Sequence, residues 1–462
     1  MVHQFKNNGY DIVLDVNSGA IHVVDDVTYD VIELFEEHTK EEISAALSDK
    51  YPPEEIAEAI EEAGQLRDSG ELFTEDVYEP HVTEFKKRPT VVKALCLHIA
   101  HDCNLACRYC FAGEGEYHGH RALMDFETGR MALDFLIAGS GNRRNLEVDF
   151  FGGEPLMNFE VVKQLVAYGR QQEKLHDKHF RFTLTTNGVL LDDDVIEFAN
   201  REMDNVVLSI DGRKEVHDRM RPFRRGAGSY DLIVPKFQKL AESRSQERYY
   251  VRGTFTHYNT DFSNDVLHLA DLGFRQISVE PVVAQPCDAY ALTEGDLPVL
   301  FAEYDKLAAE MVKRKREGRA FNFFHFMIDL EGGPCVYKRL SGCGSGTEYL
   351  AVTPWGDLYP CHQFVGNEDF LMGNVRDGVT AVDIRDEFKS CNVYAKEKCR
   401  TCFARFYCSG GCAANSYNFH GSITDAYDLG CELQKKRIEC AIMIKAAEAE
   451  IIEEEGSKDE EK

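Results

Sequence analysis

Residues 103–110 read Cys103-Asn104-Leu105-Ala106-Cys107-Arg108-Tyr109-Cys110, with three cysteines four and then three residues apart. Cysteine thiolates are the usual ligands of iron–sulfur clusters, and a [4Fe–4S] centre normally has four of them. Three cysteines therefore leave one iron of such a cluster free to bind another molecule. We interpret this stretch as a cluster loop whose free iron binds the amino and carboxylate groups of S-adenosylmethionine.

The composition limits the partners that the chain can have. The 462 residues are 44% hydrophobic and 11% aromatic, which is enough for about two to four domains with real cores. The net charge of −28 argues against nonspecific binding to nucleic acid or anionic membranes, because the long-range field repels phosphate. It is compatible with a basic or neutral peptide partner. No apolar run approaches a membrane span, and the first residues lack a secretory apolar segment. We therefore expect a cytoplasmic protein.

The fifteen cysteines need an explanation in such a compartment. Disulfides are disfavoured in the cytosol, so metal or redox chemistry is the better interpretation. A lone cysteine can instead be a small buried hydrophobic residue. We assign that role to Cys96, in a strand-like segment, and to Cys440, on a predicted helix.

The first 86 residues predict a small winged-helix-like unit. Residues 10–16 and 20–24 alternate like strands around an Asn-Ser-Gly turn and form a hairpin. Helices are expected from a cap at Asp26 or Thr28, over 41–47 and from Pro53 to residue 66, and residues 72–73 could close a wing. The acidic composition argues against DNA binding, whereas a plain packing or oligomerisation domain remains an alternative. Residues 76–89 look like a linker.

Strands and helices alternate through the central segment, from about 92 to 310. The predicted strands are 94–98, 146–151, 181–185, 206–210, 250–254 and 276–280, and the predicted helices are 126–138, 159–172, 192–200, 232–242 and 263–272. This α/β pattern predicts parallel strands with crossover helices, arranged as a partial (β/α)6 barrel. Ligands bind at the C-terminal ends of strands in such folds, and the cysteine loop follows the first strand.

Polar and glycine motifs follow the later strands. Gly152 and Gly153 let the backbone approach a ligand closely, and Glu154 could accept a hydrogen bond from an ammonium group. Ser209 and Asp211 carry hydroxyl and carboxylate groups suited to a ribose. Further positions are a Thr-Thr-Asn-Gly turn that contains Asn187, a Glu-Pro pair at Glu280, and Arg221 as a carboxylate partner, for which Arg219, Arg224 and Arg225 compete.

A Cys-x3-Cys-x2-Cys loop followed by these motifs in this order resembles the pattern of the radical S-adenosylmethionine (radical SAM) superfamily. The resemblance implies that Cys103, Cys107 and Cys110 hold the cluster and are catalytic. It also implies cofactor contacts at Tyr109, Gly152, Gly153, Glu154, Asn187, Ser209, Asp211 and Arg221. In that superfamily, one electron from the cluster cleaves the bound sulfonium into methionine and a 5′-deoxyadenosyl radical, which abstracts hydrogen from an unactivated carbon.

The cysteine density rises after residue 320 and resembles the seven-cysteine SPASM extension of peptide-modifying radical enzymes. The family pattern implies one auxiliary cluster at Cys399, Cys402, Cys408 and Cys431 and another at Cys343, Cys361 and Cys412. Three [4Fe–4S] clusters are then expected in all. Two zinc sites are the alternative, because Cys-x2-Cys is also a zinc-ribbon spacing. The second auxiliary cluster takes either Cys335 or a substrate thiolate as its fourth ligand, and we favour the thiolate. Cys287 and Cys391 are more readily structural.

The N-terminal unit resembles the recognition element of enzymes that modify ribosomally made peptides, in which a leader peptide adds a strand to a sheet edge. The whole chain most resembles the thioether-forming maturases of six-cysteine (SCIFF) peptides. This implies a recognition element over 1–86, a radical SAM barrel over 87–320, a SPASM domain over 321–448 and an acidic disordered tail over 449–462. The implied partners are a cysteine-rich precursor peptide and a reductant such as flavodoxin or ferredoxin. The alternatives are an anaerobic sulfatase maturase, or a zinc-stabilised peptide-binding protein without chemistry.

Overall fold

Six parallel strands form the frame of the molecule, and all six were predicted. The computed structural model describes residues 1–87, 89–117, 119–330 and 336–460, so Cys335 lies outside the described residues. The strands are β4 (Ala94–His101), β6 (Asn145–Gly152), β7 (His179–Thr186), β8 (Asn205–Ser209), β9 (Tyr249–Phe255) and β10 (Gln276–Pro281). Each pairs in parallel with the next of these strands along the chain. The α/β fold class is therefore confirmed.

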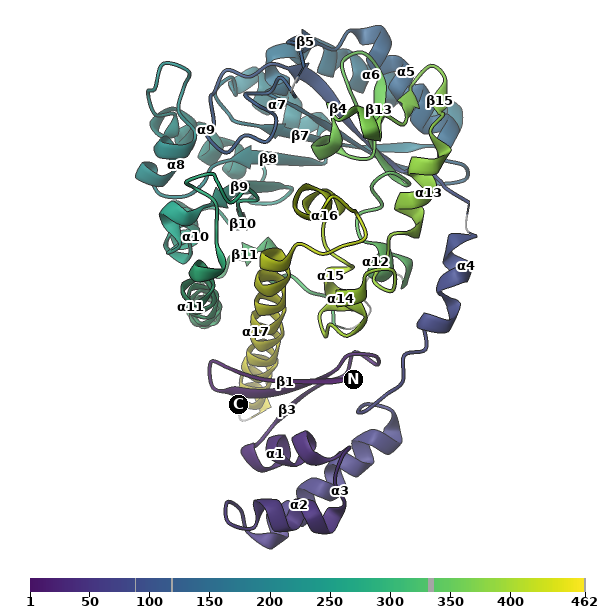
Figure 1. Cartoon of the computed structure of the whole chain (residues 1–462). Helices are drawn as coiled ribbons and strands as arrows, with labels where there is room; N and C mark the ends of the chain where they lie inside the picture. The colour runs from purple at the N-terminus through teal and green to yellow at the C-terminus, as the bar shows by residue number, and fades with distance from the viewer. Residues whose placement is uncertain (88, 118, 331–335, 461–462) are drawn as a thin grey trace.

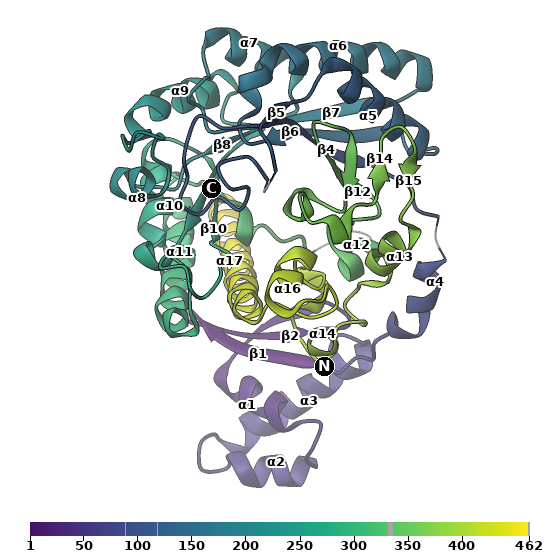
Figure 2. The same ribbon diagram turned by 45° about the horizontal axis from the view of Figure 1, so that its top comes forward.

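Helices connect these strands and cover the outer face of the curved sheet (Figures 1 and 2). They are α5 (Phe126–Gly139), α6 (Phe159–His176), α7 (Asp193–Glu202), α8 (Lys214–Met220), α9 (Tyr230–Ser243), α10 (Ser263–Asp271) and α11 (Leu297–Arg316). Side chains capping the N-termini include Asp125, which accepts from the Thr128 amide, and Asp192, which accepts from the Val195 amide. The sequence missed α8 and α11.

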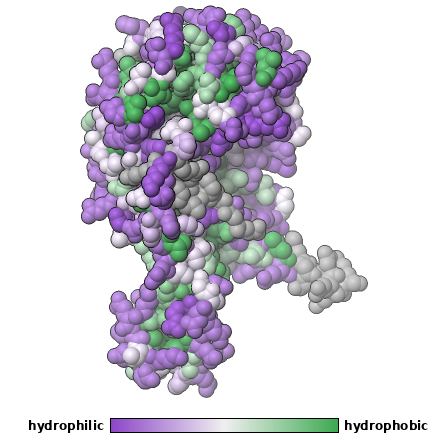
Figure 3. Space-filling view, turned by 90° about the vertical axis from the view of Figure 1, so that its right-hand side faces the viewer, coloured by the Kyte–Doolittle hydropathy of each residue, from purple (hydrophilic) through white to green (hydrophobic). Residues whose placement is uncertain are grey.

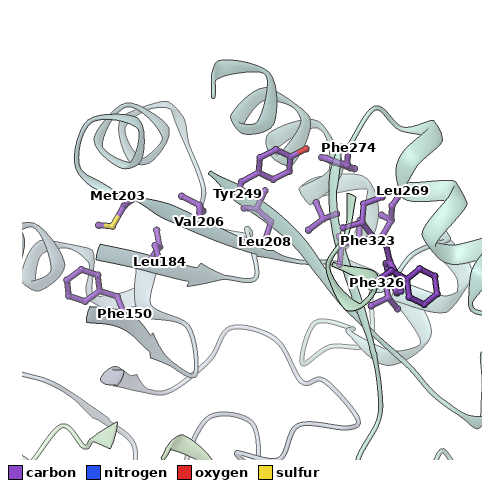
Figure 4. Packing of buried hydrophobic residues seen from close by; sticks show 14 of the residues in the cluster. Phe150, Leu184, Met203, Val206, Leu208, Tyr249, Leu269, Phe274, Phe323 and Phe326 are labelled. Carbon is purple, nitrogen blue, oxygen red and sulfur yellow. The ribbon is translucent and has the colours of Figure 1, made fainter. Parts of the chain in front are cut away.

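The core lies between the sheet and these helices. Phe180 and Phe182, which point to the same face of β7, stack on each other with ring centres 5.6 Å apart, and Phe182 stacks on Phe150 at 5.5 Å. Figure 4 shows Phe150, Leu184, Val206 and Tyr249 along this face of the sheet. Burying one such side chain contributes about 1.5–3 kcal/mol. The packed layer fixes the strand ends that carry the polar motifs.

The sheet continues beyond the six strands into the C-terminal segment. Strand β11 (Asn322–Phe323) adds to β10, and β12 (Tyr349–Val352) adds in parallel to β4 at the other side. The path goes on through β13 (Asp357–Tyr359), β14 (Gly373–Asn374) and β15 (Gly378–Val379), and β5 (Ala122–Leu123) also pairs with β4. The helices here are α12 (Val336–Ser341), α13 (Val382–Ser390), α14 (Glu397–Arg400), α15 (Arg405–Cys408) and α16 (Ala413–His420). The cysteine-rich segment is thus attached directly to the strand that precedes Cys103.

The N-terminal unit is an antiparallel sheet in the order β1-β2-β3 with three helices packed against one face. The predicted hairpin is β2 (Tyr10–Asp15) and β3 (Ile21–Val24), and β1 (Val2–Asn7) is a strand that the sequence did not predict. The helices are α1 (Asp26–Leu34), α2 (Lys40–Leu47) and α3 (Pro53–Ser69). Asp25 caps α1, so the expected cap at Asp26 or Thr28 was wrong by one residue or more. Residues 72 and 73 belong to no strand, so they close no wing.

A long C-terminal helix, α17 (Asp428–Glu460), joins the units. In Figure 1 the sheet of the N-terminal unit crosses its C-terminal half, and Figure 3 shows the rest of that unit projecting as a separate lobe. Phe5, Ile12 and Leu14 belong to the same buried cluster as Ile444 and Ala447 of α17, whereas Val13, on the other side of β2, packs with α1 and α3. The sheet is therefore buried on both faces.

Two segments that we expected to be irregular contain helices. Residues 76–89 contain the helix α4 (Val82–Lys86), although we expected a linker. Helix α17 continues to Glu460, although we expected a disordered tail from residue 449. Alanine and glutamate are good helix formers, and extending an existing helix costs far less than starting one. In the described part of the chain, no helix is both long and apolar enough to cross a membrane.

Candidate functional site

A cavity of about 260 Å³ opens at the C-terminal ends of the parallel strands. It brings together most of the predicted site residues from separate loops. Those that line it are Cys103, Cys107, Tyr109, Cys110, Gly152, Gly153, Asn187, Ser209 and Arg221. Glu154 and Asp211 are fully buried and lie behind the cavity wall instead.

The cysteine loop is held from one side by the segment that follows α8. The amide of Ala106 donates to the Pro222 carbonyl, and the amide of Arg108 donates to the Met220 carbonyl, both at 2.9 Å. Arg224 Nη2 donates to the Cys103 carbonyl at 2.7 Å. Backbone bonds of this kind fix the loop, so the three thiols keep their places around the cavity.

The two glycines allow the end of β6 to lie directly on the loop. A Cβ atom on Gly152 would lie 2.3 Å from the Ala100 oxygen, and one on Gly153 would lie 2.1 Å from the Asp102 oxygen. The amide of Gly153 donates to the Ala100 carbonyl at 2.7 Å. Gly152 has a φ of 123°, which favours glycine. Any side chain at these positions would push the strand end away from the cysteines.

The Glu154 carboxylate fastens the ends of β6 and β7 together. Its Oε1 accepts from the Thr186 hydroxyl at 2.8 Å and from the Leu156 amide at 3.0 Å, and its Oε2 accepts from the Asn187 amide at 2.8 Å. Burial raises the pKa of this carboxyl to about 7, against the lowering effect of these donors. The same side chain thus positions Asn187, whose Nδ2 lies 3.6 Å from the Cys103 sulfur.

Tyr109, Asp211 and Arg221 form one group around the buried carboxylate of Asp211. The Tyr109 hydroxyl lies 2.7 Å from both carboxylate oxygens of Asp211, and Arg221 Nε donates to the same carboxylate at 3.0 Å. The Thr254 amide also donates to it at 3.0 Å. Burial raises the pKa of Tyr109 well above its usual value. Asp211 therefore orients Arg221 and Tyr109, which both line the cavity.

The donor set fits an iron–sulfur cluster. Burial raises the pKa of Cys103 and of Cys107 to about 12, so their thiolates need a nearby cation to form at neutral pH. Iron supplies that charge, because a coordinating thiol is deprotonated on binding. Asn187 Nδ2, which lies 3.6 Å from the Cys103 sulfur, can donate to a ligand sulfur. Cys103, Cys107 and Cys110 would hold the cluster at this wall of the cavity.

The opposite wall contains Glu280, which the sequence analysis singled out, and three residues that it did not, Arg252, His362 and Gln363. Arg252 Nη2 donates to both carboxylate oxygens of Glu280 at 2.9 Å, and both side chains line the cavity with His362 and Gln363. Arg252 stands directly beside Ser209 in the register of β8 and β9. That register, which the sequence does not show, is the signal that would have found it. His362 follows Cys361 in the sequence, so the cavity extends from the first cysteine loop to the segment that carries one of the C-terminal cysteines.

The C-terminal cysteines gather in two groups. In one, the pKa of Cys361 is raised by burial and by the thiols of Cys412 and Cys343. In the other, the pKa of Cys431 is raised to about 12 by burial and by the thiols of Cys408, Cys399 and Cys402. Among the described residues, no three His, Cys, Asp or Glu side chains are close enough together to hold a single metal ion. A cubane distributes its thiolates over several irons, so its ligands do not converge on one point.

The other described cysteines differ in their surroundings. Cys96 and Cys440 are buried among apolar side chains, as predicted for small hydrophobic residues. Cys440 Sγ lies 3.5 Å from Asp305 Oδ1. Cys391 Sγ lies 3.2 Å from the Ile423 carbonyl, and Cys287 is exposed.

Comparison with known sequences gives one family and several relatives. Residues 97–256 match the model of the radical SAM superfamily. An uncharacterised protein of Methanocaldococcus jannaschii is 33% identical over 309 residues, which are 66% of this chain and 96% of that protein. The radical SAM cyclopropyl synthase TigE of Paramaledivibacter caminithermalis is 20% identical, over 74% of this chain and 72% of its own. The cysteine-type anaerobic sulfatase-maturating enzyme of Clostridium novyi is 24% identical, over 73% and 92%.

Solved structures share the fold. Native anSMEcpe with bound AdoMet and Cp18Cys peptide has a TM-score of 0.64 at 20% identity and covers 78% of this chain and 99% of its own. Streptococcus suis SuiB bound to precursor peptide SuiA has a TM-score of 0.54 at 17% identity and covers 93% and 98%. The SuiB likeness extends into the N-terminal unit, because residues after 86 make up only about four fifths of this chain. With its cysteine loop at the C-terminal ends of a parallel α/β sheet, this chain is an enzyme of the radical SAM superfamily, related to SPASM-type maturases.

Proposed function

We propose that this enzyme joins a cysteine sulfur to a carbon of an acceptor residue, with threonine as one candidate, in a ribosomally made precursor peptide. The observation that carries the proposal is the single cavity that touches both Cys103, Cys107 and Cys110 on one side and His362, next to Cys361, on the other. A substrate in this cavity would lie between the radical source and a second iron site.

The groups that bind there would supply complementary chemistry. A cluster at the first loop supplies the electron that turns bound S-adenosylmethionine into a hydrogen-abstracting radical. An auxiliary cluster at Cys343, Cys361 and Cys412 would bind the substrate thiolate if no fourth protein ligand is present. Cys335, the other candidate for that position, lies outside the described residues. Arg221 would hold the methionine carboxylate, and Ser209 would contact the ribose.

The peptide would be guided by the N-terminal unit. In the described part of the chain, β3 pairs with another strand on one side only. Alternate residues of an antiparallel strand point their N–H and C=O groups away from the partner. The bond from the Asp15 amide to the Ala20 carbonyl places Ile21 and Val23 in that outward set. A leader peptide adding at this edge is the mode that we propose, and SuiB, whose structure holds a precursor peptide, shares the fold.

The direct test is mass spectrometry of a cysteine-rich peptide encoded beside the gene, after co-expression with the enzyme. A thioether lowers the peptide mass by two hydrogens, retains sulfur and blocks alkylation of that cysteine. Formylglycine, the product expected of a sulfatase maturase, loses the sulfur. Anaerobically purified protein should be brown, with about twelve iron atoms for three cubanes. A colourless protein with zinc would contradict the radical mechanism.

The leader site can be tested by Val23→Pro, which removes one outward N–H while leaving the β2 pairing intact. We expect weaker binding of the full precursor and unchanged cleavage of S-adenosylmethionine without peptide. Val23→Ala, which keeps the N–H, is the matched control. Equal affinity of the two variants would contradict strand addition at β3.

A further inference from the structure

The loop that carries Cys399, Cys402 and Cys408 has little structure of its own. It consists of α14 and α15, each of four residues, with an irregular turn between them and a left-handed residue, Ser409 (φ 61°), after them. Helices this short are not stable in isolation. Contacts with residues outside the loop must therefore help to hold the three thiols in one arrangement.

Arg405 connects this loop to the N-terminal unit. It stands between Cys402 and Cys408 in the sequence and is only 5% exposed. Its Nη2 donates to Asn17 Oδ1 at 2.6 Å and to Asp76 Oδ2 at 3.0 Å. Its Nη1 donates to the carbonyl of Arg400, within the loop itself. One buried guanidinium thus joins both halves of the cysteine loop to residues of the N-terminal unit.

The partners of Arg405 are themselves fixed. Asn17 lies in the turn between β2 and β3, and its Nδ2 donates to the Thr74 carbonyl at 2.6 Å. The Thr74 amide donates to the buried carboxylate of Asp15 at 3.0 Å. Asp76 also accepts from the Tyr394 hydroxyl at 2.9 Å. The β2–β3 turn and residues 74–76 therefore form one hydrogen-bonded binding site for the guanidinium.

Aromatic contacts extend the same interface. The ring of His3 stacks on Phe403 with centres 3.5 Å apart and planes 5° from parallel. The ring of Tyr78 meets Phe406 edge-on at 5.8 Å. Both phenylalanines belong to the cysteine loop, and Phe406 is buried. The contacts lie on both sides of Arg405 in the sequence, so the middle of the loop packs against the N-terminal unit.

We propose that the N-terminal unit is a structural part of the auxiliary cluster site: Asn17 and Asp76, through Arg405, hold the loop of Cys399, Cys402 and Cys408 in its ligand-binding conformation. The inference rests on the proposed cluster at these cysteines. These are positioning residues, since they act through Arg405 and contact no cysteine ligand. The β2–β3 turn borders the strand edge that we assign to the leader. The proposed leader site and this cluster loop therefore both depend on the same turn.

The test measures iron and sulfide in a parent variant in which Cys103, Cys107 and Cys110 are changed to Ala, so that only auxiliary clusters remain. The parent should hold about eight iron atoms for two cubanes after anaerobic reconstitution. Adding Asn17→Ala and Asp76→Ala should lower this twofold, to about four, with loss of one of the two electron paramagnetic resonance signals of the reduced protein. Neither substitution changes a cysteine, so the ligands themselves stay intact.

The matched control is Asn7→Ala in the same parent. Asn7 Nδ2 donates to Asp305 Oδ1 at 2.7 Å and attaches the N-terminal sheet to α11, away from the cysteine loop. This variant should keep about eight iron atoms. Full iron in the Asn17 and Asp76 double variant would overturn the inference while leaving the clusters in place. A parent without auxiliary iron would refute the proposed clusters themselves. With native radical-site cysteines, the double variant should still cleave S-adenosylmethionine without peptide; loss of that activity would indicate a general folding role instead.

Discussion

The phenol of Tyr109 lies 2.7 Å from both carboxylate oxygens of Asp211, a residue 102 positions later in the chain. Arg221 Nε donates to the same carboxylate at 3.0 Å, and its guanidinium lies 5.4 Å from the centre of the Tyr109 ring. The cysteine loop is therefore attached to the end of β8 by a buried ion pair and a phenol. This group connects the fold to the site, because each side chain is held in place by its contacts with the other two.

Removing one of these side chains should lower the free energy of unfolding, and the loss should be larger when a buried charge is left unpaired. Asp211→Ala leaves the guanidinium of Arg221 buried without its carboxylate, which should lower the free energy of unfolding by about 3–5 kcal/mol. Tyr109→Phe removes one hydrogen bond and keeps the ion pair, so we expect a loss of about 1–3 kcal/mol. Urea denaturation of both variants measures the difference. Equal losses would mean that the phenol, and not the charge pair, anchors the loop.

The close approach of β6 to the cysteine loop predicts a strict requirement for glycine. In Gly153→Ala the new Cβ would lie 2.1 Å from the Asp102 oxygen, so the strand end must move away from the thiols. Displacement of about 1 Å at a reacting centre can lower a rate by about 100-fold. We expect a loss of that order in 5′-deoxyadenosine formation, measured by chromatography. Gly295→Ala is the control, because its Cβ meets nothing closer than 3.5 Å; similar losses in both would rule out the steric explanation.

Local patterns in the sequence predicted the parts of the fold that local interactions determine. Phe182 and Leu184 alternate with polar residues in the strand predicted over 181–185, and the spacing of Cys103, Cys107 and Cys110 marks a ligand loop. Contacts between distant segments left no such pattern. Arg252 reaches the cavity through the register of β9, and Arg405 meets Asn17 across 388 positions. These residues could be placed only once the sheet order and the position of α17 were known.

Two cysteines of α17 provide a matched pair for the ligand assignment. Cys431 belongs to the group with Cys399, Cys402 and Cys408, whereas Cys440 is fully buried, with Asn7 and Asp305 as its polar neighbours. Cys431→Ala should therefore lower the iron content by about four atoms per chain, the content of one cubane. Cys440→Ala should leave the iron content unchanged, because that thiol is a packing residue. Iron loss in the Cys440 variant, measured by a colorimetric assay, would contradict the assignment.

The buried imidazole of His217 predicts an acid-sensitive fold. Its Nδ1 accepts from the Asp211 amide at 3.3 Å and its Nε2 lies 2.9 Å from the Ser229 hydroxyl, with no solvent contact. Burial lowers the pKa of His217 from 6.5 to about 4. Between these values the unfolded chain binds a proton that the folded chain does not, so the stability from this residue is present above pH 6.5 and is lost as the pH falls to 4.

The size of this contribution follows from the two pKa values. At 1.36 kcal/mol per pH unit it is about 3 kcal/mol at most. The advantage in unfolding free energy of wild type over His217→Gln should therefore shrink by up to that amount between pH 7 and pH 4, as measured by denaturant unfolding at a series of pH values. His176, on the exposed last turn of α6, is the control, and His176→Gln should differ from wild type by a nearly constant amount. A difference for His217→Gln that is also independent of pH would show that the imidazole has the same pKa in the folded and the unfolded protein, which would contradict the lowered value.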